Sequence, residues 1–401
     1  MSSRDVRLAP PALWGVILSA MVMLLSACST TPGALRGSGD LGVVIERADG
    51  NVKVIETSGR SVLATVGGLG DLSHASVVFS RDGRYAFVFG RDGGLTKVDL
   101  LQARIVGRVV QAGNAIGGSI SHDGSLVVAQ NYEPGGIKAF DANTLELVAD
   151  VPATADDGTR SKVVGLADLS GKCFIYSLFE AGEIRITDFS DPKNPVTQRF
   201  AGGKQPYDAL VSPNGRYYIA GLFGEDGLAL IDLWNLHKGS RKILSGYGRG
   251  EQPLPVFKMP HLRGWSIAGN RAYLPAIGRH EVLVVDTDTW QEVGRIKVRS
   301  QPVFAMARPD GREIWVNFAF PDNGWVQVID TVSGLVTATL QPGRGILHME
   351  FLSKGHEIWM SARDDNKVVI YDTATKQPIG GFDALSPSGI FFTTRAARTG
   401  F

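Results

Sequence analysis

The sequence predicts an all-β fold, an eight-bladed β-propeller of four-stranded blades. Three observations lead there: 49 glycines and 19 prolines among 401 residues, a motif that recurs every forty-odd residues, and short apolar runs separated by Asp-Gly or Asn-Gly pairs. Many turns favour short strands over long helices, and no convincing amphipathic helix follows residue 40. The net charge of +1 and the lack of a basic stripe with interleaved aromatics give no reason to expect nucleic acid as a partner.

The recurring motif is an apolar strand that ends in an acidic residue, as in GGLTKVDL or NKVVIYDT. Seven copies end at Asp99, Asp141, Asp188, Asp232, Asp286, Asp330 and Asp372, and a shorter first copy, GNVKVIET, has Glu56 in this place. Successive acidic residues are 43, 42, 47, 44, 54, 44 and 42 residues apart, which is the spacing of propeller blades. We expect these aspartates to accept hydrogen bonds from turn amides rather than to act as catalytic acids.

Hairpins such as SRDGRYAFV and SPNGRYYIA join two strands within each unit, and their Asp-Gly and Asn-Gly pairs supply the positive φ that such turns need. The units at the two ends are incomplete. The unit of Glu56 has about two strands, and residues 383–395 supply two more with no unit to complete. A blade shared by N- and C-terminal strands would close the ring and remove its sheet edges, which gives eight blades, with seven as the alternative.

The N-terminus has the pattern of a lipoprotein signal peptide. Arg4 and Arg7 precede an apolar stretch, residues 12–25, that is short for a membrane span, and LSAC places Cys28 after a small-residue cleavage site. This resembles a bacterial lipobox, and a plain signal peptide with an incidental cysteine is the alternative. We expect a signal peptide over residues 1–27, a flexible tether over 28–40 and the propeller over 41–401. The expected location is the periplasm, with a lipid anchor at Cys28 and, because Ser29 follows it, at the outer membrane.

The positions of Cys173 and of the seven histidines indicate which of them could belong to a site. If Cys28 is lipidated, Cys173 has no partner for an intrachain disulfide, and its setting, GKCFIYSLF, predicts a small buried side chain. His74 precedes the first strand of its unit, a place that in a propeller lies toward the channel mouth, and the other histidines divide into two groups. Equivalent loops hold Tyr207, Asp208, His261, Phe304 and His348, of which His348 is expected in the core, whereas His122, His237, His280 and His356 lie in hairpins or polar loops.

These histidines do not have the short spacings of a zinc site. A single axial histidine is enough for the iron of a planar macrocycle, because the ring itself supplies four ligands. The carboxylates of such a macrocycle would pair with arginines, and Arg91, Arg263, Arg344 and Arg363 are available. The chain has no Gly-x-Ser-x-Gly elbow and no glycine-rich loop in a βαβ unit, so nucleophilic catalysis and dinucleotide binding find little support. An ordinary loop histidine is the alternative for His74.

The stretch SHASVVFSRDGRYAFVFGRDGGLTKVDL resembles the d1-haem propeller domain of cytochrome cd1 nitrite reductase, and a weaker likeness extends over nearly all of residues 41–401. The resemblance implies that His74 is the axial ligand of the haem iron and that Arg91 and Asp92 match the family's Arg-Asp. It implies an aromatic-proline turn at Tyr132 and Pro134. Tyr207, followed by Asp208, takes the place of a distal histidine, and His261 falls near a second one.

The chain also departs from the reductase. It has no Cys-x-x-Cys-His and therefore no c-type haem domain to deliver electrons, and it lacks a distal histidine, both of which argue against nitrite reduction. A propeller of this type with a lipobox is similar to a family of haem d1 biosynthesis proteins. That resemblance implies an iron tetrapyrrole as ligand, haem d1 or a late precursor such as dihydro-haem d1. A d1-haem dehydrogenase-like protein and cytochrome cd1 nitrite reductase are the implied partners.

The same resemblance distributes the roles within the site. His74 binds iron, while Arg91, Tyr132 and Arg263 contact the macrocycle. Tyr207, Asp208 and His261 lie on its opposite face, where a general acid or base could act. A late-step tetrapyrrole-modifying enzyme, a non-catalytic carrier and a scaffold for envelope proteins all remain compatible with the sequence.

Overall fold

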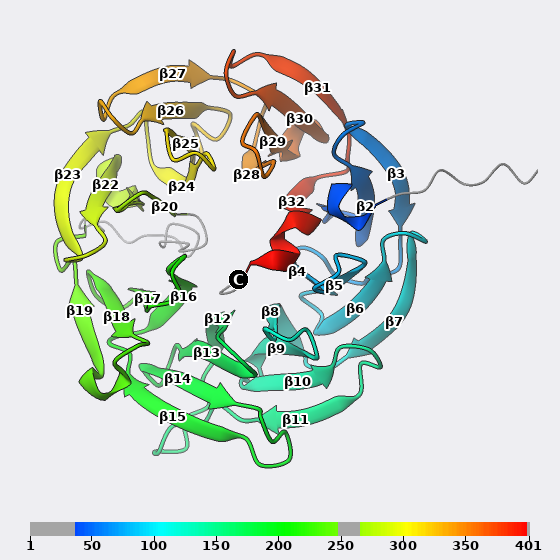
Figure 1. Ribbon diagram of the computed structural model, residues 1–401, viewed down its shortest axis with the longest axis vertical. Coiled ribbons are helices and arrows are strands. Elements are labelled where there is room, and N and C mark those ends of the chain that lie inside the picture. The colour runs from blue at the N-terminus through cyan, green and yellow to red at the C-terminus, as the bar shows by residue number, and fades with distance from the viewer. Residues whose placement is uncertain (1–36, 248–264, 399–401) are drawn as a thin grey trace, which may run out of the picture. The chain divides into compact units, whose positions relative to one another are not determined.

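The ring of the protein is seen in a computed structural model that describes residues 37–247 and 265–398. Eight four-stranded antiparallel sheets surround a common axis (Figure 1), which confirms the predicted eight-bladed propeller. Helical structure in these residues is limited to the short 3-10 segments η2 (Ser38–Asp40), η3 (Leu236–Lys238), η6 (Ile277–Arg279), η7 (Arg363–Asp365) and η8 (Thr393–Ala397). None of the described helices is long and apolar enough to cross a membrane. The expected signal peptide and Cys28 lie outside the described residues.

We number the blades in chain order and call their strands A to D from the axis outward (Figure 1). Blade 1 has β4 (Ser76–Phe79), β5 (Tyr85–Phe89), β6 (Gly94–Asp99) and β7 (Arg104–Val110); blade 2 has β8 (Asn114–Ile120), β9 (Leu126–Glu133), β10 (Ile137–Asp141) and β11 (Leu147–Val151). Blade 3 has β12 (Val163–Asp168), β13 (Cys173–Leu178), β14 (Glu183–Asp188) and β15 (Val196–Ala201); blade 4 has β16 (Pro206–Val211), β17 (Tyr217–Leu222), β18 (Leu228–Asp232) and β19 (Ser240–Ile243).

The second half of the ring repeats the same order. Blade 5 has β20 (Ser266–Ala268), β21 (Arg271–Ala276), β22 (Glu281–Asp286) and β23 (Gln291–Lys297); blade 6 has β24 (Pro302–Ala307), β25 (Glu313–Phe318), β26 (Val326–Asp330) and β27 (Val336–Leu340). Blade 7 has β28 (Ile346–Phe351), β29 (Glu357–Ala362), β30 (Lys367–Asp372) and β31 (Pro378–Asp383). The closing blade has β32 (Pro387–Phe392), β1 (Leu41–Glu46), β2 (Asn51–Glu56) and β3 (Ser61–Val66).

The closing blade joins the two ends of the chain, as predicted, but not in equal shares. It takes three strands from the N-terminal end and only β32 from the C-terminal end, whereas two from each were expected. Residues 383–395 yield a single strand because the chain turns into η8 at Thr393. The Thr393 hydroxyl there lies 2.8 Å from the Leu41 carbonyl oxygen and 2.6 Å from that of Ser38, which fixes the seam between the two ends.

The turns behave as the sequence predicts. The hairpin glycines Gly83, Gly124, Gly215 and Gly311 have φ between 67° and 73°. Asp99 ends β6, and its Oδ1 accepts hydrogen bonds from the amides two and three residues on, at 3.0 and 3.1 Å. The same pattern follows Asp141, Asp286 and Asp372. The repeated acidic residue is therefore a turn-forming residue, and its invariant place in the repeat reflects local structure.

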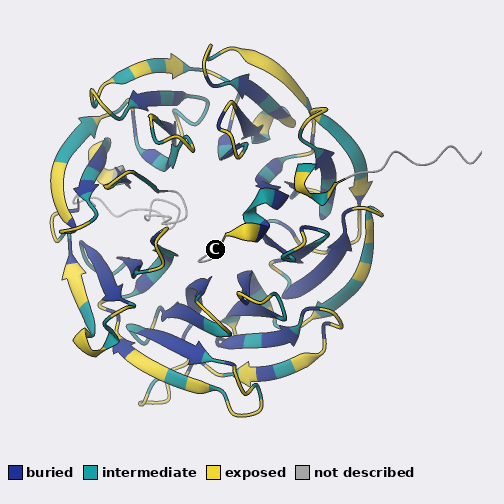
Figure 2. Ribbon diagram, in the orientation of Figure 1, coloured by how far each residue is buried: buried dark blue, intermediate teal, exposed yellow. Residues whose placement is uncertain are grey.

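Burial is lowest at the rim, where Figure 2 shows the outermost strands largely in teal and yellow around the dark-blue strands B and C. All of β6 is buried, whereas β7, beside it at the rim, has no buried residue. Apolar side chains pack between neighbouring sheets: Phe87 and Phe89 of blade 1, for example, share a cluster with Val127 of blade 2. The continuous apolar runs of the sequence are thus strands covered on both faces by the adjacent blades.

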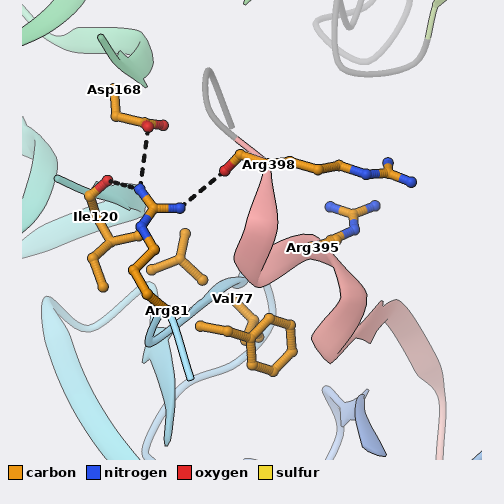
Figure 3. A pocket seen from close by; sticks show the side chains of 8 residues that line it. Val77, Arg81, Ile120, Asp168, Arg395 and Arg398 are labelled. Atoms are coloured by element: carbon orange, nitrogen blue, oxygen red, sulfur yellow. Dashed lines mark hydrogen bonds and ion pairs between the residues drawn. The ribbon is translucent and has the colours of Figure 1, made fainter. Parts of the chain in front are cut away.

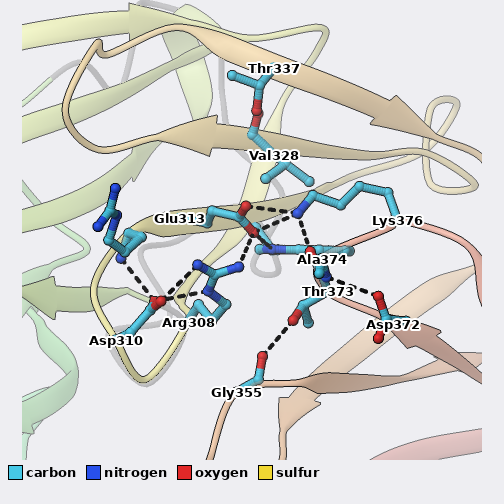
Figure 4. A network of polar contacts seen from close by, with 12 residues as sticks. Arg308, Asp310, Glu313, Val328, Thr337, Gly355, Asp372, Thr373, Ala374 and Lys376 are labelled. Atoms are coloured by element: carbon cyan, nitrogen blue, oxygen red, sulfur yellow. Dashed lines mark hydrogen bonds and ion pairs between the residues drawn. The ribbon is translucent and has the colours of Figure 1, made fainter.

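A charged contact occurs at equivalent places between two pairs of blades, and Figure 4 shows the one at Glu313. Glu313, at the start of β25, accepts hydrogen bonds from Lys376 of blade 7 at 2.7 and 2.9 Å and from the indole N–H of Trp315 at 3.0 Å. Glu357, at the start of β29, stands in the same place, and Arg60 of the closing blade donates to it at 2.7 and 3.0 Å. The two Glu-Ile-Trp segments therefore fasten blade 6 to blade 7 and blade 7 to the closing blade.

The two faces of the ring differ. The linkers that lead into strands A and the turns that join strands B and C lie on one, the linker face, and the hairpins between strands A and B on the other, the hairpin face. On the hairpin face η8 lies near the axis (Figure 1), where Arg395 pairs with Glu350. Arg81 donates to the carbonyl oxygens of Ala396 and Arg398 at 3.0 Å each, and Figure 3 shows its contact with Arg398. The cavity between them has only about 20 Å³, room for a water molecule.

Candidate functional site

Several predicted site residues lie together on the linker face because of the way the strands pair. In an antiparallel pair, the start of strand A lies beside the end of strand B. In blades 1, 3, 4 and 7 the linker is also hydrogen-bonded to the B–C turn of its own blade. The pairs are Arg91 N to Asp71 O at 2.8 Å, Phe179 N to Lys162 O at 3.0 Å, Phe223 N to Gln205 O at 2.8 Å and Arg363 N to Gly345 O at 3.1 Å. His74, Arg91, Tyr132 and Tyr207 therefore share one face of the ring.

His74 lies two residues before β4 and is exposed. The linker that carries it is held by Asp71, whose Oδ1 accepts a hydrogen bond from the Ser73 amide at 2.8 Å and whose carbonyl accepts from Arg91. The Ser73 contacts, followed by smaller contributions from Arg91 and Arg47, lower the pKa of Asp71. The imidazole thus stands on a fixed segment at a place that a ligand on the linker face can reach.

Arg91 and Asp92 have different parts in their turn. Asp92 accepts a hydrogen bond from the Gly94 amide at 3.0 Å and pairs with Arg108 at 2.6 Å, so its carboxylate is used to hold the turn. Arg91 is exposed, and within the described residues it makes no ion pair shorter than 4.0 Å. The resemblance implies that both Arg91 and Asp92 belong to the site. Of the two, only Arg91 has a charge that a ligand on the linker face could pair with.

Tyr207 and Asp208 lie inside strand β16 rather than in the loop where the sequence places them. The pairing with β17 runs from Pro206 opposite Leu222 to Ala209 opposite Ala220, so β16 holds one extra residue there. The same β-bulge interrupts β12, β24 and β28, which puts Phe304 and His348 in strands as well. A bulge bends its strand and redirects the side chains, and such irregularities are frequent beside functional sites.

Four aromatic side chains from blades 2, 3 and 4 form a cluster on the linker face, here called the aromatic arc: Tyr132, Phe179, Tyr207 and Phe223. The hydroxyls of Tyr132 and Tyr207 are 2.8 Å apart, and the Phe179 ring packs edge-on against Tyr207 and Phe223 at 5.8 and 5.6 Å. Phe179 and Phe223 were not predicted, although each follows strand B in a Leu-Phe pair, in SLFEAG and GLFGED.

The two phenols remain protonated over the physiological range. Burial is the main cause that raises the pKa of Tyr132 and of Tyr207; the charge of Asp208 adds to it, and that of Arg91 opposes it. In such a pair one hydroxyl donates to the other, and the accepting hydroxyl keeps a proton that it can donate elsewhere. The aromatic arc therefore offers a flat ligand an apolar surface with a hydroxyl donor.

The other predicted residues are divided among several places. His261 and Arg263 lie outside the described residues. Arg344 pairs with Asp365 at 2.6 Å and Arg363 with Asp364 at 2.8 Å, all on the linker face. His122, His237, His280 and His356 are exposed, as expected. Cys173 is only partly buried, so its predicted full burial is wrong: it is the first residue of β13, next to the hairpin turn.

His348 has a structural role, although it is half-buried rather than part of the core that the sequence predicts. Its Nδ1 accepts a hydrogen bond from the Ile390 amide of the closing blade at 3.2 Å, and its ring packs against Phe304 and Phe391. Burial lowers the pKa of His348 to about 4, so the ring is neutral at physiological pH. Among the described residues, no three His, Cys, Asp or Glu side chains are placed to hold a metal ion. A macrocyclic iron would need only one histidine.

The propeller and its linker face define the class of the protein. The Cytochrome D1 heme domain family matches residues 36–396, which span the whole ring. Two curated proteins called NirF are similar over nearly their full lengths: that of Stutzerimonas stutzeri is 58% identical over 96% of this chain and 98% of its own, and that of Pseudomonas aeruginosa 57% over 95% and 97%. The chain therefore belongs to the cytochrome d1 heme domain family and, within it, to the NirF proteins.

More distant relatives share the architecture. The dihydro-heme d1 dehydrogenase of Pseudomonas aeruginosa is 26% identical over 90% of this chain and 73% of its own. The solved structure of dihydro-heme d1 dehydrogenase NirN in complex with DHE superposes with a TM-score of 0.79 at 23% identity, over 93% of this chain and 79% of that one. AztD of Citrobacter koseri superposes with a TM-score of 0.60 at 12% identity, over 87% and 96%. At these identities the superpositions establish the shared fold.

Proposed function

We propose that this protein acts in haem d1 biosynthesis by binding an iron tetrapyrrole, haem d1 or a late precursor such as dihydro-haem d1, on its linker face. The family match over the whole ring and the similarity to dihydro-heme d1 dehydrogenase support this role. The observation that carries it is the position of His74, exposed on the linker face next to the Arg91 turn, with the aromatic arc on the next blades.

The residues present fit such a ligand. His74 would bind the iron, which in a tetrapyrrole already has four ring nitrogens. Arg91 and Arg363 would pair with the macrocycle's carboxylates, and the rings of Tyr207 and Phe179 would contact its apolar surface. Iron supplies a redox-active Lewis acid when bound, and the chain's own part is to orient the macrocycle and to place the Tyr132 and Tyr207 protons near it.

The first experiment is an absorption titration of the purified protein with haem d1. The wild type should bind, and His74→Ala should lose the axial band and bind at least tenfold more weakly, which corresponds to about 1.4 kcal/mol. His122→Ala is the matched control, because His122 is also exposed but lies in a hairpin on the opposite face. If the wild type shows no spectral change, it does not bind the haem, and the scaffold interpretation is the one that remains. If His74→Ala keeps the axial band, His74 is not the ligand of the iron.

The protein could change the ligand as an enzyme or hold it unchanged as a carrier, and the mass of the tetrapyrrole after incubation distinguishes the two. If the protein is a late-step enzyme, two hydrogen atoms would leave the macrocycle's periphery, one as a proton relayed by Tyr207 or Asp208 and one as a hydride taken up by an added two-electron acceptor. Incubation of dihydro-haem d1 with that acceptor would then lower its mass. If the protein is a carrier, the ligand would leave unchanged for a d1-haem dehydrogenase-like protein or cytochrome cd1 nitrite reductase. The enzymatic proposal fails if the mass stays the same with these partners present as well as without them.

We also propose that the protein works in the periplasm, anchored by lipid at Cys28 to the outer membrane. The lipobox-like LSAC supports this. Fractionation of cells should recover the wild type with the outer membrane and Cys28→Ser with the soluble periplasmic proteins. Recovery of both in the same fraction would contradict the anchor.

A further inference from the structure

The contact between blades 4 and 5 lacks the charged pair that joins blade 6 to blade 7. In blade 7, the residue four positions after the acidic end of strand C is Lys376, and it pairs with Glu313, the first residue of strand B in blade 6 (Figure 4). In blade 5 the same position is held by Trp290, and strand B of blade 4 begins with Tyr217. The rings of Trp290 and Tyr217 pack edge-on, with their centroids 5.3 Å apart. An aromatic contact therefore takes the place of a cation and a carboxylate.

A cavity of about 300 Å³ lies beside this aromatic contact on the hairpin face. Its walls come from the A–B hairpins of blades 4 and 5 and from the C–D turn of blade 5, which contains Trp290. The cavity next to η8 has only about 20 Å³. Pockets that bind small molecules typically measure about 300–1,000 Å³, so the cavity between blades 4 and 5 is large enough for a small ligand.

Polar groups of this lining lack hydrogen-bond partners in the part of the chain that the structure describes. The Trp290 side chain is 2% exposed, and its indole N–H, which can only donate, has no acceptor. Asn214 uses its side-chain oxygen to accept from the Ser212 hydroxyl and the Arg216 amide, which leaves its own N–H groups for a ligand. The carboxylate of the exposed Asp288 makes no hydrogen bond with the described residues. The cavity therefore has both donors and an acceptor to offer.

Arg216 holds an aromatic ring at the border of the cavity. Its guanidinium group pairs with Asp232 at 3.0 Å and lies over the rings of Tyr217 and Trp234, at 4.8 and 5.3 Å from their centroids. Because Arg216 is part of the lining, Trp234 is next to the cavity. Trp234 is nevertheless 64% exposed. Its ring is supported by a guanidinium group and still open to solvent, so a ligand with a flat apolar surface can stack on it.

These groups together fit a neutral ring that carries several hydroxyl groups. Arg216 is positive and Asp288, which attracts it, is negative, so an ion of either sign would meet a like charge in the lining. A hydroxyl group both donates and accepts, which suits the Asp288 carboxylate and the N–H groups of Asn214 and Trp290 at the same time. The C–H face of a pyranose ring is apolar and stacks on an aromatic ring such as that of Trp234. A sugar presents both kinds of surface on one small ring.

We propose that the cavity between blades 4 and 5 is a second binding site, which takes one pyranose ring of a saccharide. Trp234 is the stacking platform, and Asp288 and Asn214 are hydrogen-bond partners of the sugar hydroxyls. This site is on the hairpin face, whereas the proposed tetrapyrrole site is on the linker face. The inference goes beyond the proposed function and does not depend on it, since either site can exist without the other.

The test is saturation-transfer NMR with chitotriose and maltotriose, followed by titration of the sugar signals with each protein. We expect the wild type to bind at least one of the two sugars. Trp234→Ala and Asp288→Asn should each weaken binding by about tenfold, because each removes a direct contact. Phe320→Ala is the matched control and should bind as the wild type does. Phe320 is an aromatic residue that is 80% exposed, but it lies in the B–C turn of blade 6, on the linker face.

The outcomes decide whether the cavity holds a sugar. A wild type that binds neither sugar at millimolar concentration overturns the proposal, and so does a loss in Phe320→Ala as large as that in Trp234→Ala. Trp234→Tyr, which keeps an aromatic ring, should retain most of the binding, and urea unfolding midpoints should be the same in all these proteins. A lowered midpoint of Trp234→Ala together with no recovery in Trp234→Tyr would count against the site.

The molecular mass in solution tests the other way in which Trp234 could be covered. Light scattering should give the same mass for the wild type and Trp234→Ala. A dimeric wild type and a monomeric Trp234→Ala would show that a second copy of the chain packs on Trp234, which would overturn the sugar site.

Discussion

The hydroxyl oxygens of Tyr132 and Tyr207 lie 2.8 Å apart, although the two residues are 75 positions apart in the chain and belong to blades 2 and 4. The contact spans blade 3, whose Phe179 packs against the Tyr207 ring at 5.8 Å. It therefore couples three blades at the place where the ligand is proposed to bind. A substitution of either tyrosine therefore tests both the packing between these blades and the proposed binding site.

Removing either hydroxyl should have little effect when the other is already gone. Tyr132→Phe and Tyr207→Phe should each lower the free energy of unfolding by about 1 kcal/mol, the usual net value of one hydrogen bond. The double variant should lose about the same amount, because its first substitution has already removed the contact. Urea unfolding of the four proteins measures this. Strictly additive losses would show that the 2.8 Å contact contributes nothing to stability.

The raised pKa values of the same tyrosines predict a loss of stability at high pH. Below about pH 10 the phenols are protonated in the folded and the unfolded chain, so they add no pH dependence. Above that pH the unfolded chain ionises first and is favoured, so stability should fall as pH rises from about 10. Unfolding midpoints between pH 8 and 11 test this, and the double Phe variant should show a smaller decline than the wild type.

His348 predicts the opposite dependence at low pH. Its folded pKa of about 4 lies below the ordinary 6.5, so between these values the unfolded chain binds a proton that the folded chain does not. Stability should be constant above about pH 6.5 and fall by roughly 2 to 3 kcal/mol as pH drops toward 4. His348→Asn, which offers an oxygen to the Ile390 amide, should flatten this part of the curve, while the exposed His356→Asn should leave it unchanged. Equal curves for all three proteins would contradict the shift.

The sequence was sufficient for features that depend on neighbouring residues. The spacing from Asp99 to Asp372 gave the blade count because each acidic residue closes its own turn within three positions. It was insufficient where two distant segments decide the structure. The bulge that takes in Tyr207 exists only relative to the pairing with β17, and in blades 6 and 7 the bulged amides of Phe304 and His348 are satisfied by Asn317 and Ser361 of strand B.

The position of Arg47, directly after strand B of the closing blade and on the linker face, was missed for a similar reason. The sequence analysis assigned about two strands to the first unit, so the turn after β1 could not be matched with the B–C turns of Arg91 and Arg363. That equivalence became visible only when β32 was placed as strand A of the closing blade, in front of β1. Residues that the chain brings together by closing a ring are therefore the ones that a repeat pattern alone does not reveal.

The Arg395–Glu350 pair on the hairpin face should be important for stability. Glu350 is only 5% exposed, and Arg395 is its ion-pair partner from η8. Arg395→Gln would remove the hydrogen-bonded counter-charge of this buried carboxylate and leave only the weaker attraction of Arg398, which should cost about 3 kcal/mol. Arg104→Gln, at an exposed position in β7, should change stability by less than about 0.5 kcal/mol. The comparison is made by urea unfolding, and a similar small effect of both substitutions would show that η8 does not need this pair.

Two glycines separate the cost of backbone conformation from the cost of close approach. Gly93 and Gly171 have nearly the same φ, 78° and 74°, but a Cβ at Gly93 would lie 1.9 Å from the carbonyl oxygen of Ala112, whereas nothing lies within 4 Å of one at Gly171. Gly171→Ala should therefore cost only the conformational strain, about 1 kcal/mol. Gly93→Ala must also displace the strand-end backbone and should cost at least about 3 kcal/mol. Because Gly93 is in the Arg91 turn, Gly93→Ala should also weaken haem d1 binding, while Gly171→Ala, on the hairpin face, should not. If Gly93→Ala and Gly171→Ala lose the same stability, the linker that contains Ala112 moves aside without cost. The linker face would then be less rigid than its hydrogen bonds indicate.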